Sequence, residues 1–378
     1  MKISIAVHGR FHAFELAREL YRRGALAGLA TTYPAFAARR IVGRRANIHA
    51  APWLELRRRL YQKFQFGRKP DVAIATAFGR FAARTAATEG DLLVGWSAAT
   101  LEAIPVAHGR GAAVVLERGS SHIAHQTAVL TEAYARHGLS FDETPPQIIE
   151  RELAEYAEAD AIAVPSTFAA TTFLARGVSL EKLIVNPYGV DLMRFAPNRL
   201  ADHGKPRILF VGRVGIRKGV PELLRAFAEI RDHAELHLVG PVEAGMRQIM
   251  AGLPMDGVTV SGPVDASRLP EIYNAADIFC LPSLEEGFPL VMLQAMACGL
   301  PVMGTAATGI SDLVDNGRQG LIIPDGDDKA LAGALSELAA DPARRREMAA
   351  YARARVENGC GWADYAGRAM AHYERLLS

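Results

Sequence analysis

Residues 283–305 read Ser-Leu-Glu-Glu-Gly-Phe-Pro-Leu-Val-Met-Leu-Gln-Ala-Met-Ala-Cys-Gly-Leu-Pro-Val-Met-Gly-Thr. The apolar run at 278–281 predicts a buried parallel strand just before this stretch. Pro289 predicts that a helix opens there, because a proline in the first helical turn lacks only an N–H that would be unpaired anyway. Free N–H groups at a helix start favour an anion such as phosphate, and the adjacent acid Glu286 can hold hydroxyl groups. The stretch therefore predicts a pocket for a sugar phosphate.

A second loop carries two cations. Residues 207–211 predict another strand, and the loop after it reads Gly212-Arg213-Val214-Gly215-Ile216-Arg217-Lys218-Gly219. Arg213 and Lys218 suit a diphosphate, because a guanidinium makes bidentate contacts and an ammonium supplies a compact charge. Negative charge grows on the diphosphate when a sugar nucleotide breaks, so these cations would stabilise the transition state more than the ground state. The alternative is a solvated basic loop without a ligand.

The first of these stretches carries a family resemblance. Glu286-Gly287-Phe288-Pro289, followed by Ala295-Met296-Ala297-Cys298-Gly299 and Pro301-Val302, resembles the donor-binding signature of the retaining glycosyltransferases of family 4. The resemblance implies a GT-B fold, in which two α/β domains face each other across a cleft. It also implies that Arg213 and Lys218 hold the diphosphate, that Glu286 contacts the donor sugar, and that Gly212 belongs to the phosphate loop.

The same resemblance extends to the donor contacts around the helix start. The amides of Gly287, Phe288 and Leu290 can donate hydrogen bonds, whereas Pro289 has no N–H. The family signature has a Glu, seven residues, and a second Glu that grips ribose hydroxyls, but this chain has Gln294 at the second position. An amide oxygen still accepts a hydrogen bond without the charge, so we expect weaker or altered nucleotide binding. The alternative is that Gln294 is a helix residue without a ligand role.

Length and patterning predict two domains. The chain has 378 residues, which exceeds a comfortable single core. Apolar runs alternate with helix-period segments, the pattern of parallel α/β sheets. We expect an α/β fold with two doubly wound, Rossmann-like domains: an acceptor-binding domain at 1–190, a linker at 191–206 and a nucleotide-sugar domain at 207–360. By resemblance, a last helix at 361–378 returns to the first domain.

Expected strands and helices follow from the same patterning. The strands are expected at 3–7, 26–31, 92–95, 113–116, 161–164, 183–185, 207–211, 235–239, 258–260, 278–281, 301–303 and 320–323. The helices are expected at 13–23, 124–137, 146–157, 168–175, 221–230, 268–274, 290–297, 330–339 and 344–356.

Composition limits the environment and the chemistry. No run approaches the roughly 18 apolar residues of a membrane span, and residues 1–7 read as a first strand, so we expect a cytoplasmic protein. The three cysteines, Cys280, Cys298 and Cys360, show no metal or redox spacing. Asp325-Gly326-Asp327 predicts a turn and a helix cap. We therefore expect no cofactor and no essential metal, with cationic side chains in place of an ion.

Candidate residues in the first domain follow two expected strands. Gly9 and Arg10 occupy the loop after the first strand, where family members often have a glycine-rich loop that approaches phosphate or sugar. His12 lies in the same loop and either serves a proton transfer or caps the loop. Many family members place a His near the end of a later strand; here Glu117 or Arg118 stands at that position. His122 is therefore our candidate for the reacting centre, with Glu117 and Ser120 as neighbours.

Positive charge gathers at residues 39–69, which contain ten basic residues and one acid, Glu55, interleaved with Trp53, Leu54, Leu56, Leu60, Tyr61, Phe64 and Phe66. A solvated surface is one interpretation. A membrane-facing patch is another, because anionic lipid attracts Lys and Arg while aromatic rings enter the interface. Nucleic-acid binding is disfavoured, because no nucleic-acid motif accompanies the patch.

These observations predict a retaining, metal-independent glycosyltransferase that moves a hexose-type sugar from a nucleotide-diphosphate sugar to a hydroxyl of a saccharide or lipid-linked acceptor. Family frequency and the basic patch favour a role in cell-envelope polysaccharide or glycolipid synthesis at the inner face of the membrane. Two alternatives stay open: a sugar-nucleotide 2-epimerase of the same fold, and a non-catalytic sugar-nucleotide binder.

Overall fold

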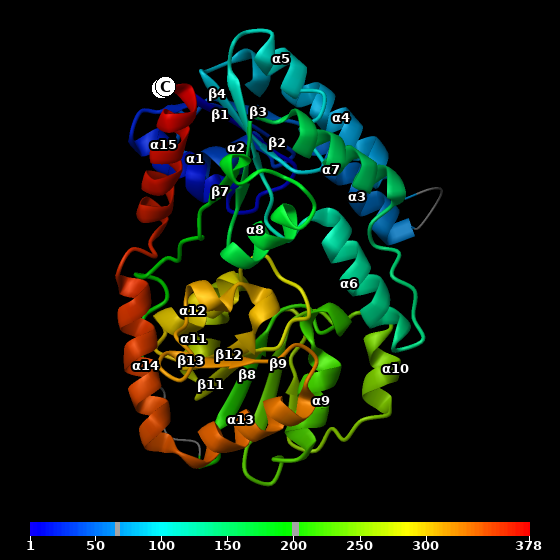
Figure 1. Ribbon diagram of the computed structural model, residues 1–378, viewed down its shortest axis with the longest axis vertical. Coiled ribbons are helices and arrows are strands. Elements are labelled where there is room, and N and C mark those ends of the chain that lie inside the picture. Colours follow the sequence, from blue (N-terminus) through cyan, green and yellow to red (C-terminus); the bar gives the residue numbers. More distant parts are fainter. Residues whose placement is uncertain (65–68, 199–203) are drawn as a thin grey trace.

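The computed structural model describes residues 1–64, 69–198 and 204–378, which form two lobes that each contain one parallel sheet flanked by helices (Figure 1). The middle of the expected linker, 199–203, and Phe66 of the basic patch lie outside the described residues. Strands were predictable because they are buried on both faces and so read as near-continuous apolar runs. In the first strand, Ile3 and Ile5 enter one core cluster while Ala6 enters another.

The first lobe has a seven-stranded sheet in the order β3-β2-β1-β4-β5-β6-β7. Its strands are β1 (Ile3–Val7), β2 (Leu26–Thr31), β3 (Ile48–Ala50), β4 (Leu92–Trp96), β5 (Ala113–Glu117), β6 (Ala161–Val164) and β7 (Leu183–Val185). Its helices are α1 (Ala13–Arg22), α2 (Ala35–Val42), α3 (Pro52–Phe64), α4 (Asp71–Ala83), α5 (Ile104–His108), α6 (Ile123–Ala135), α7 (Pro146–Glu158) and α8 (Thr167–Leu174).

The second lobe has a six-stranded sheet in the order β10-β9-β8-β11-β12-β13. Its strands are β8 (Arg207–Val211), β9 (Glu235–Val239), β10 (Val258–Val260), β11 (Ile278–Leu281), β12 (Val302–Thr305) and β13 (Gly320–Ile323). Its helices are α9 (Val220–Ala228), α10 (Met246–Ala251), α11 (Leu269–Asn274), α12 (Leu290–Ala297), α13 (Asp328–Ala340) and α14 (Pro342–Glu357). In both sheets the strand order reverses beside the first strand, at β1/β4 and at β8/β11, which is where open α/β sheets bind ligands.

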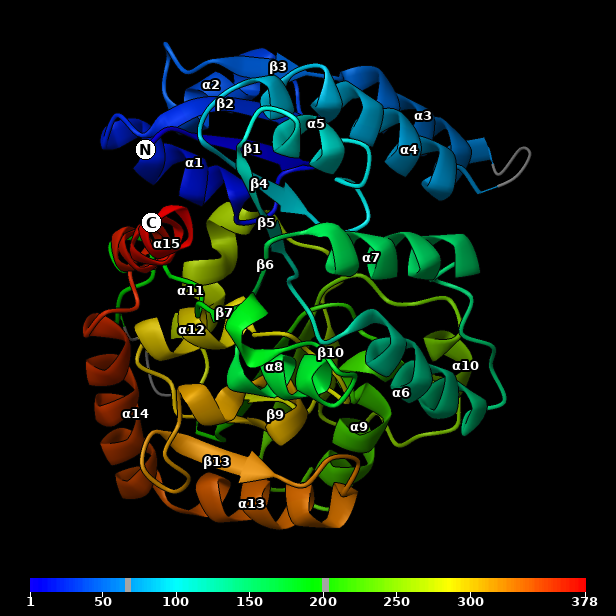
Figure 2. The same cartoon turned by 45° about the horizontal axis from the view of Figure 1, so that its top comes forward.

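The last helix, α15 (Trp362–Leu377), lies beside α1 on the first lobe, whereas α14 lies on the second (Figures 1 and 2). Arg23 holds it there through a hydrogen bond from Nη2 to the carbonyl oxygen of Ala363, at 2.7 Å. Gly189 is needed where the chain passes this crossing, because a Cβ there would meet the backbone of Gly361 at 2.7 Å.

Most of the expected strands and helices are confirmed to within one or two residues at each end. The structure also contains several elements that were not expected. Residues 35–83 contain α2, β3, α3 and α4, none of which was expected, and α5 and α10 were missed as well. Helix α12 begins at Leu290, so Pro289 is its N-cap rather than its first residue. One smaller prediction is confirmed, because Asp327 caps α13. The three cysteines are free and buried.

Candidate functional site

A cavity of about 720 Å³ lies between the lobes, at the strand-order reversals of both sheets. The loops after β1, β4 and β5 supply one wall, and the loops after β8 and β11 with the start of α12 supply the other. Residues of both lobes line the cavity, and they include His8, His12, Arg58, Asp71, Trp96, Ser97, Arg118, Ser120, Gln126, Glu143, Glu152, Arg217, Lys218, Glu286, Phe288 and Leu290. Both sheets therefore point the ends of their central strands at one shared space.

Lys218 and Glu286 meet on the second-lobe wall, where Lys218 Nζ donates a hydrogen bond to Glu286 Oε2. Gly219 allows this meeting: its φ is +66°, and a Cβ there would lie 1.9 Å from the carbonyl oxygen of Pro282. Only glycine lets the loop after β8 lie this close to the loop after β11. Burial, with the neighbouring Arg217, lowers the pKa of Lys218 to about 7. Near pH 7 part of the Lys218 population is therefore a neutral amine, which gains a proton when an anion enters.

Arg217 lines the same wall and Glu285 is buried beside it, although neither was selected from the sequence. Glu285 is fully buried, and its Oε2 lies 2.9 Å from Arg217 Nη2. Across the lobe boundary it accepts hydrogen bonds from the hydroxyls of Ser120 (2.7 Å) and Ser121 (2.6 Å) and from the Gln126 amide (2.9 Å). Burial alone would raise the pKa of Glu285, but these partners lower it to about 2. The carboxylate thus stays charged and ties the two lobes together.

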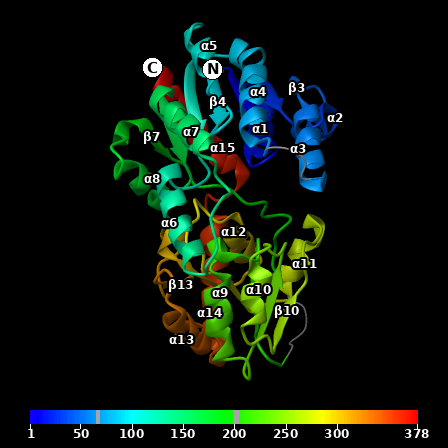
Figure 3. The ribbon, with the colours of Figure 1, turned by 90° about the vertical axis from the view of Figure 1, so that its right-hand side faces the viewer.

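Backbone also crosses the lobe boundary closely at Gly287. A Cβ on this residue would lie 2.3 Å from the carbonyl oxygen of Gly119 and 2.6 Å from Cα of Ser120. Its own carbonyl accepts a 2.6 Å hydrogen bond from Ser166, the residue that also caps α8. Figure 3 shows α6 and α8 of the first lobe reaching down to the second lobe at this level. The loop between β11 and α12, which contains Gly287, is therefore held against the first lobe by backbone contact.

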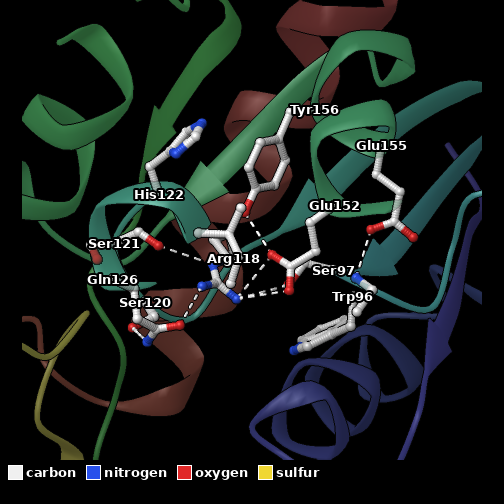
Figure 4. A network of polar contacts seen from close by, with 12 residues as sticks. Trp96, Ser97, Arg118, Ser120, Ser121, His122, Gln126, Glu152, Glu155 and Tyr156 are labelled. Carbon is white, nitrogen blue, oxygen red and sulfur yellow. Dashed lines mark hydrogen bonds and ion pairs between the residues drawn. The ribbon is translucent and has the colours of Figure 1, made fainter. Parts of the chain in front are cut away.

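On the first-lobe wall, Arg118 is the centre of a polar network (Figure 4). Its Nη1 lies 3.1 Å from Glu152 Oε2, and its Nη2 donates to Gln126 Oε1 at 2.9 Å. Gln126 in turn contacts Glu285, so the network continues into the second lobe. Arg118 was one of two residues that the sequence placed at the family's usual His position, and it is the one that lines the cavity.

The structure places Arg213 outside the cavity. Its Nη1 forms a 2.9 Å ion pair with Glu143 Oε1 from the other lobe, and it lines a neighbouring hollow with Tyr134 and Glu243. The two side chains are 58% and 52% exposed, and ion pairs this exposed contribute about 1 kcal/mol or less. Since Glu143 lines both spaces, Arg213 stands at the edge of the cavity in a weak contact.

His122 faces the protein interior rather than the cavity. Its Nδ1 accepts a 3.2 Å hydrogen bond from the amide of Ala124 and so caps α6, and its ring packs against Tyr156 and Phe173. Burial, followed by nearby cations, lowers its pKa to about 4, so the ring is neutral at pH 7. His12, in contrast, lines the cavity, stacks on Tyr188 and lies 3.5 Å from the buried Glu117.

The remaining predicted contacts have local structural partners. Gly9 adopts φ +101° and donates its N–H to Thr32 Oγ1, and Arg10 lies 3.7 Å from Glu15 at the surface. The amide of Gly212 donates to the carbonyl of Val239 at 2.9 Å. Gln294 Oε1 accepts a 3.0 Å hydrogen bond from Tyr273, so its amide oxygen is already engaged. Phe288 and Leu290 do line the cavity.

The described part of the chain contains no group of three or more His, Cys, Asp or Glu side chains placed to hold a metal ion. Metal independence stays a prediction.

Comparisons with known proteins agree with this arrangement. Residues 205–341 match the family model described as Glycosyl transferases group 1. D-inositol 3-phosphate glycosyltransferase from Pseudarthrobacter chlorophenolicus is 33% identical over 254 residues, which is 61% of this chain and 60% of that protein. The corresponding protein from Kineococcus radiotolerans is 35% identical over 233 residues, 53% of each chain. The chain thus spans half to three fifths of the length of these curated relatives.

Solved structures share the fold at low identity. Sucrose-phosphate synthase from Thermosynechococcus elongatus has a TM-score of 0.73 at 23% identity, covering 100% of this chain and 96% of that one. HepE from Anabaena, solved in complex with UDP and glucose, has a TM-score of 0.70 at 17% identity, covering 99% and 100%. These matches confirm the expected GT-B fold with two α/β domains, and the family match confirms the resemblance seen in the sequence.

Proposed function

We propose that this chain, whose residues 205–341 belong to the glycosyl transferases group 1 family, moves a hexose-type sugar from a nucleotide-diphosphate sugar to a hydroxyl group of a saccharide or lipid-linked acceptor. The observation that carries the proposal is the meeting of Lys218, Glu286 and the first turn of α12 on one wall of a cavity whose other wall belongs to the other lobe. The second lobe binds the donor, and the first lobe presents the acceptor.

The donor is expected to separate Lys218 from Glu286. Its diphosphate takes the ammonium of Lys218, the amide of Phe288 just before α12 and the first-turn amide of Leu290, because first-turn amides have no partner within their own helix. Its sugar hydroxyls take the carboxylate of Glu286. Arg217 adds positive charge from the same wall, and Arg213 reaches the diphosphate once its exposed pair with Glu143 opens.

The proposed chemistry is a front-face displacement. The acceptor oxygen forms a bond to C1 of the sugar while the bond from C1 to the phosphate oxygen breaks, and that oxygen takes the acceptor's proton. The configuration at C1 is retained, and the cations stabilise the charge that grows on the leaving diphosphate. The anomeric proton coupling of the product, measured by NMR, tests retention directly.

Two assays test the function. Calorimetric titration with a panel of nucleotide-diphosphate sugars, with and without Mg²⁺ after chelator treatment, is expected to identify one donor that binds without metal. Mass spectrometry then follows the donor with and without candidate acceptors. A glycosylated acceptor with released nucleoside diphosphate supports transfer. Isomerised donor in the absence of acceptor identifies an epimerase instead, and a donor that stays unchanged with every acceptor identifies a binder.

Donor affinity is expected to fall as the pH rises above 7. Lys218 has a pKa of about 7 in the free protein, and a bound diphosphate raises that pKa. The complex therefore holds more protons than the free protein above pH 7, and linkage predicts affinity losses of up to about tenfold per pH unit. Titration of a nucleotide sugar between pH 6 and 9 measures this. The Lys218→Arg variant should flatten the slope; an equally steep slope in that variant would assign the effect to another group.

We further propose that α3 docks the protein on an anionic membrane on the cytoplasmic side, as part of envelope polysaccharide or glycolipid synthesis. Trp53, Leu56, Leu60 and Phe64 recur at helical spacing and are 49–61% exposed. The exposed cations Arg57, Arg59 and Lys63 lie on the same helix, and Arg58 lines the cavity. Such a helix lies in the membrane interface. No helix in the described ranges is long and apolar enough to cross a membrane.

The double substitution Leu56→Gln and Leu60→Gln is expected to weaken binding to vesicles containing anionic lipid by roughly tenfold or more, because two apolar side chains leave the interface. Thermal stability should change little, since both side chains are largely exposed. Leu180→Gln, at a 68% exposed leucine on another surface, is the matched control. Equal sedimentation of the double variant and wild type with vesicles would rule out docking through α3.

A further inference from the structure

Four residues that line the first-lobe wall each have a buried polar atom without a hydrogen-bond partner in the described part of the chain. Two of these atoms belong to residues in ion pairs: His12 Nε2 lies 3.5 Å from Glu117 Oε2, and the Arg58 guanidinium pairs with Glu55. The other two atoms belong to residues that form no ion pair with a described residue. They are Nε1 of Trp96, at the end of β4, and Nε2 of His8, just after β1. Trp96 is only 6% exposed, and both residues line the cavity between the lobes. Since buried polar groups are nearly always hydrogen-bonded, two such atoms facing one space indicate that a ligand supplies the missing partners.

The loop after β4, which follows Trp96, is fixed in advance. The buried Glu155 accepts hydrogen bonds from the amides of Ala98 (2.6 Å), Thr100 (2.7 Å) and Leu101 (2.9 Å). Ala98 holds φ +68°, and its carbonyl accepts a 2.7 Å hydrogen bond from Arg151. A backbone strained this way persists only where its surroundings over-determine it. Trp96 and Ser97 therefore keep their positions before a ligand arrives.

Both arginines of this wall already have an acidic partner. Arg58 pairs with Glu55, and Arg118 pairs with Glu152 at 3.1 Å. Asp71 adds a negative charge and forms no ion pair with a described residue. Burial, followed by Arg58, lowers the pKa of His8 to about 4, so its ring is neutral at pH 7. Among the described residues, the wall offers neutral donors and acceptors, and its two arginines are each paired with a glutamate.

We propose that this wall binds the acceptor as a neutral, polyhydroxylated group, a saccharide or a cyclitol, with Trp96 Nε1 donating to one hydroxyl oxygen and His8 Nε2 bonded to a second hydroxyl. The aromatic face of Trp96 and the apolar Ile74 and Ile148 complete the subsite. The inference rests on the proposed transfer reaction, which it deepens by naming the acceptor's chemical class.

Ligand-observed NMR on the unmodified protein, without any donor, tests the proposal. The probes are matched pairs: glucose with glucose 6-phosphate, mannose with mannose 6-phosphate, and myo-inositol with an inositol monophosphate. At least one neutral member is expected to bind roughly tenfold more tightly than its phosphate. Trp96→Phe, which removes the N–H and keeps an aromatic ring, should weaken that neutral ligand about five- to tenfold, the loss of one hydrogen bond. His8→Ala, at a less buried position, should weaken the same ligand.

Two controls distinguish a lost ligand contact at Trp96 from a folding defect and from a loss of donor binding. Trp362→Phe, on α15 and away from the cavity, should leave saccharide binding unchanged. Donor affinity, measured by titration, should be the same in Trp96→Phe and wild type. A phosphorylated ligand that binds better than its neutral partner, no neutral ligand that binds, or an unchanged affinity in both variants would overturn the inference. Failure of nucleotide-sugar binding in the wild type would instead overturn the proposed function, whatever the saccharides do.

Discussion

Replacing Lys218 with alanine is expected to lower kcat by roughly 100- to 1000-fold, the cost of removing one preorganised charged donor from a developing anion. Lys218 is the cation that lies nearest Glu286 in the cavity, so its loss removes positive charge at the leaving diphosphate and leaves Glu286 with only the 3.9 Å ion pair to Arg217. Part of the loss should appear as weaker donor binding, because the ground-state diphosphate also contacts the ammonium. Steady-state kinetics with the best donor measures both effects.

Lys329→Ala is the matched control for this prediction. Lys329 is exposed on α13, outside the cavity, so its removal should leave kcat and donor affinity unchanged. The thermal midpoint of Lys218→Ala should lie close to that of wild type, since burial already disfavours the charged lysine. Turnover of Lys218→Ala within threefold of wild type would remove Lys218 from the diphosphate site.

Gly287→Ala is expected to lower kcat by roughly 100-fold or more while donor affinity changes little. The added Cβ would meet backbone atoms of Gly119 and Ser120 at 2.3 and 2.6 Å, and backbone cannot move aside as a flexible side chain can. The second lobe keeps its own donor contacts, but the acceptor wall is held away from them. A misplacement of about 1 Å at reacting groups can cost 100-fold.

Gly333→Ala gives the control, because Gly333 lies within α13 and a Cβ there meets nothing within 4 Å. It should keep full activity and gain slightly in stability, as alanine favours helices over glycine by about 1 kcal/mol. Small-angle scattering is expected to show a more open shape for Gly287→Ala than for wild type. A Gly287→Ala protein with normal kcat and an unchanged scattering curve would show that the lobe contact at Gly287 has no part in catalysis.

The parts of the fold that were predicted share a physical cause. Strands β1, β4, β6 and β11 are buried along their whole length, so each reads as a near-continuous apolar run, whereas the missed β3 is short and contains His49. Helix α3 was missed for the opposite reason: Trp53, Leu56, Leu60 and Phe64 have helical spacing but point outward, and among arginines they read as a charged patch. Only Leu54 of this helix is buried.

In the candidate site, the sequence analysis identified side chains whose loop carries a recognisable motif. It missed side chains whose role depends on hydrogen bonds between the two lobes. Lys218 and Glu286 belong to the two quoted loops, and both line the cavity. Glu285 sits next to Glu286 in the same motif, but its buried partners Ser120, Ser121 and Gln126 come from the other lobe. No local pattern signals such a contact.

Arg213 and His122 were selected from the sequence for the site, but contacts with residues distant in sequence keep both side chains out of the cavity. Arg213 occupies the expected loop, yet Glu143 from the first lobe draws it to the cavity's edge. His122 is close in sequence to the end of β5, yet the packing of Tyr156 and Phe173 turns its ring inward. In both cases a residue distant in sequence decides where the side chain lies.

The crystal structure of the chain bound to its best nucleotide-diphosphate sugar, grown in the presence of a metal chelator, tests the central claim most directly. The account predicts density for the ligand between the lobes, with the diphosphate within hydrogen-bond distance of Lys218 Nζ and the first-turn amides of α12, and the sugar hydroxyls on Glu286. A nucleotide sugar bound anywhere else on the chain, or bound in this cavity with its diphosphate away from Lys218, would contradict it.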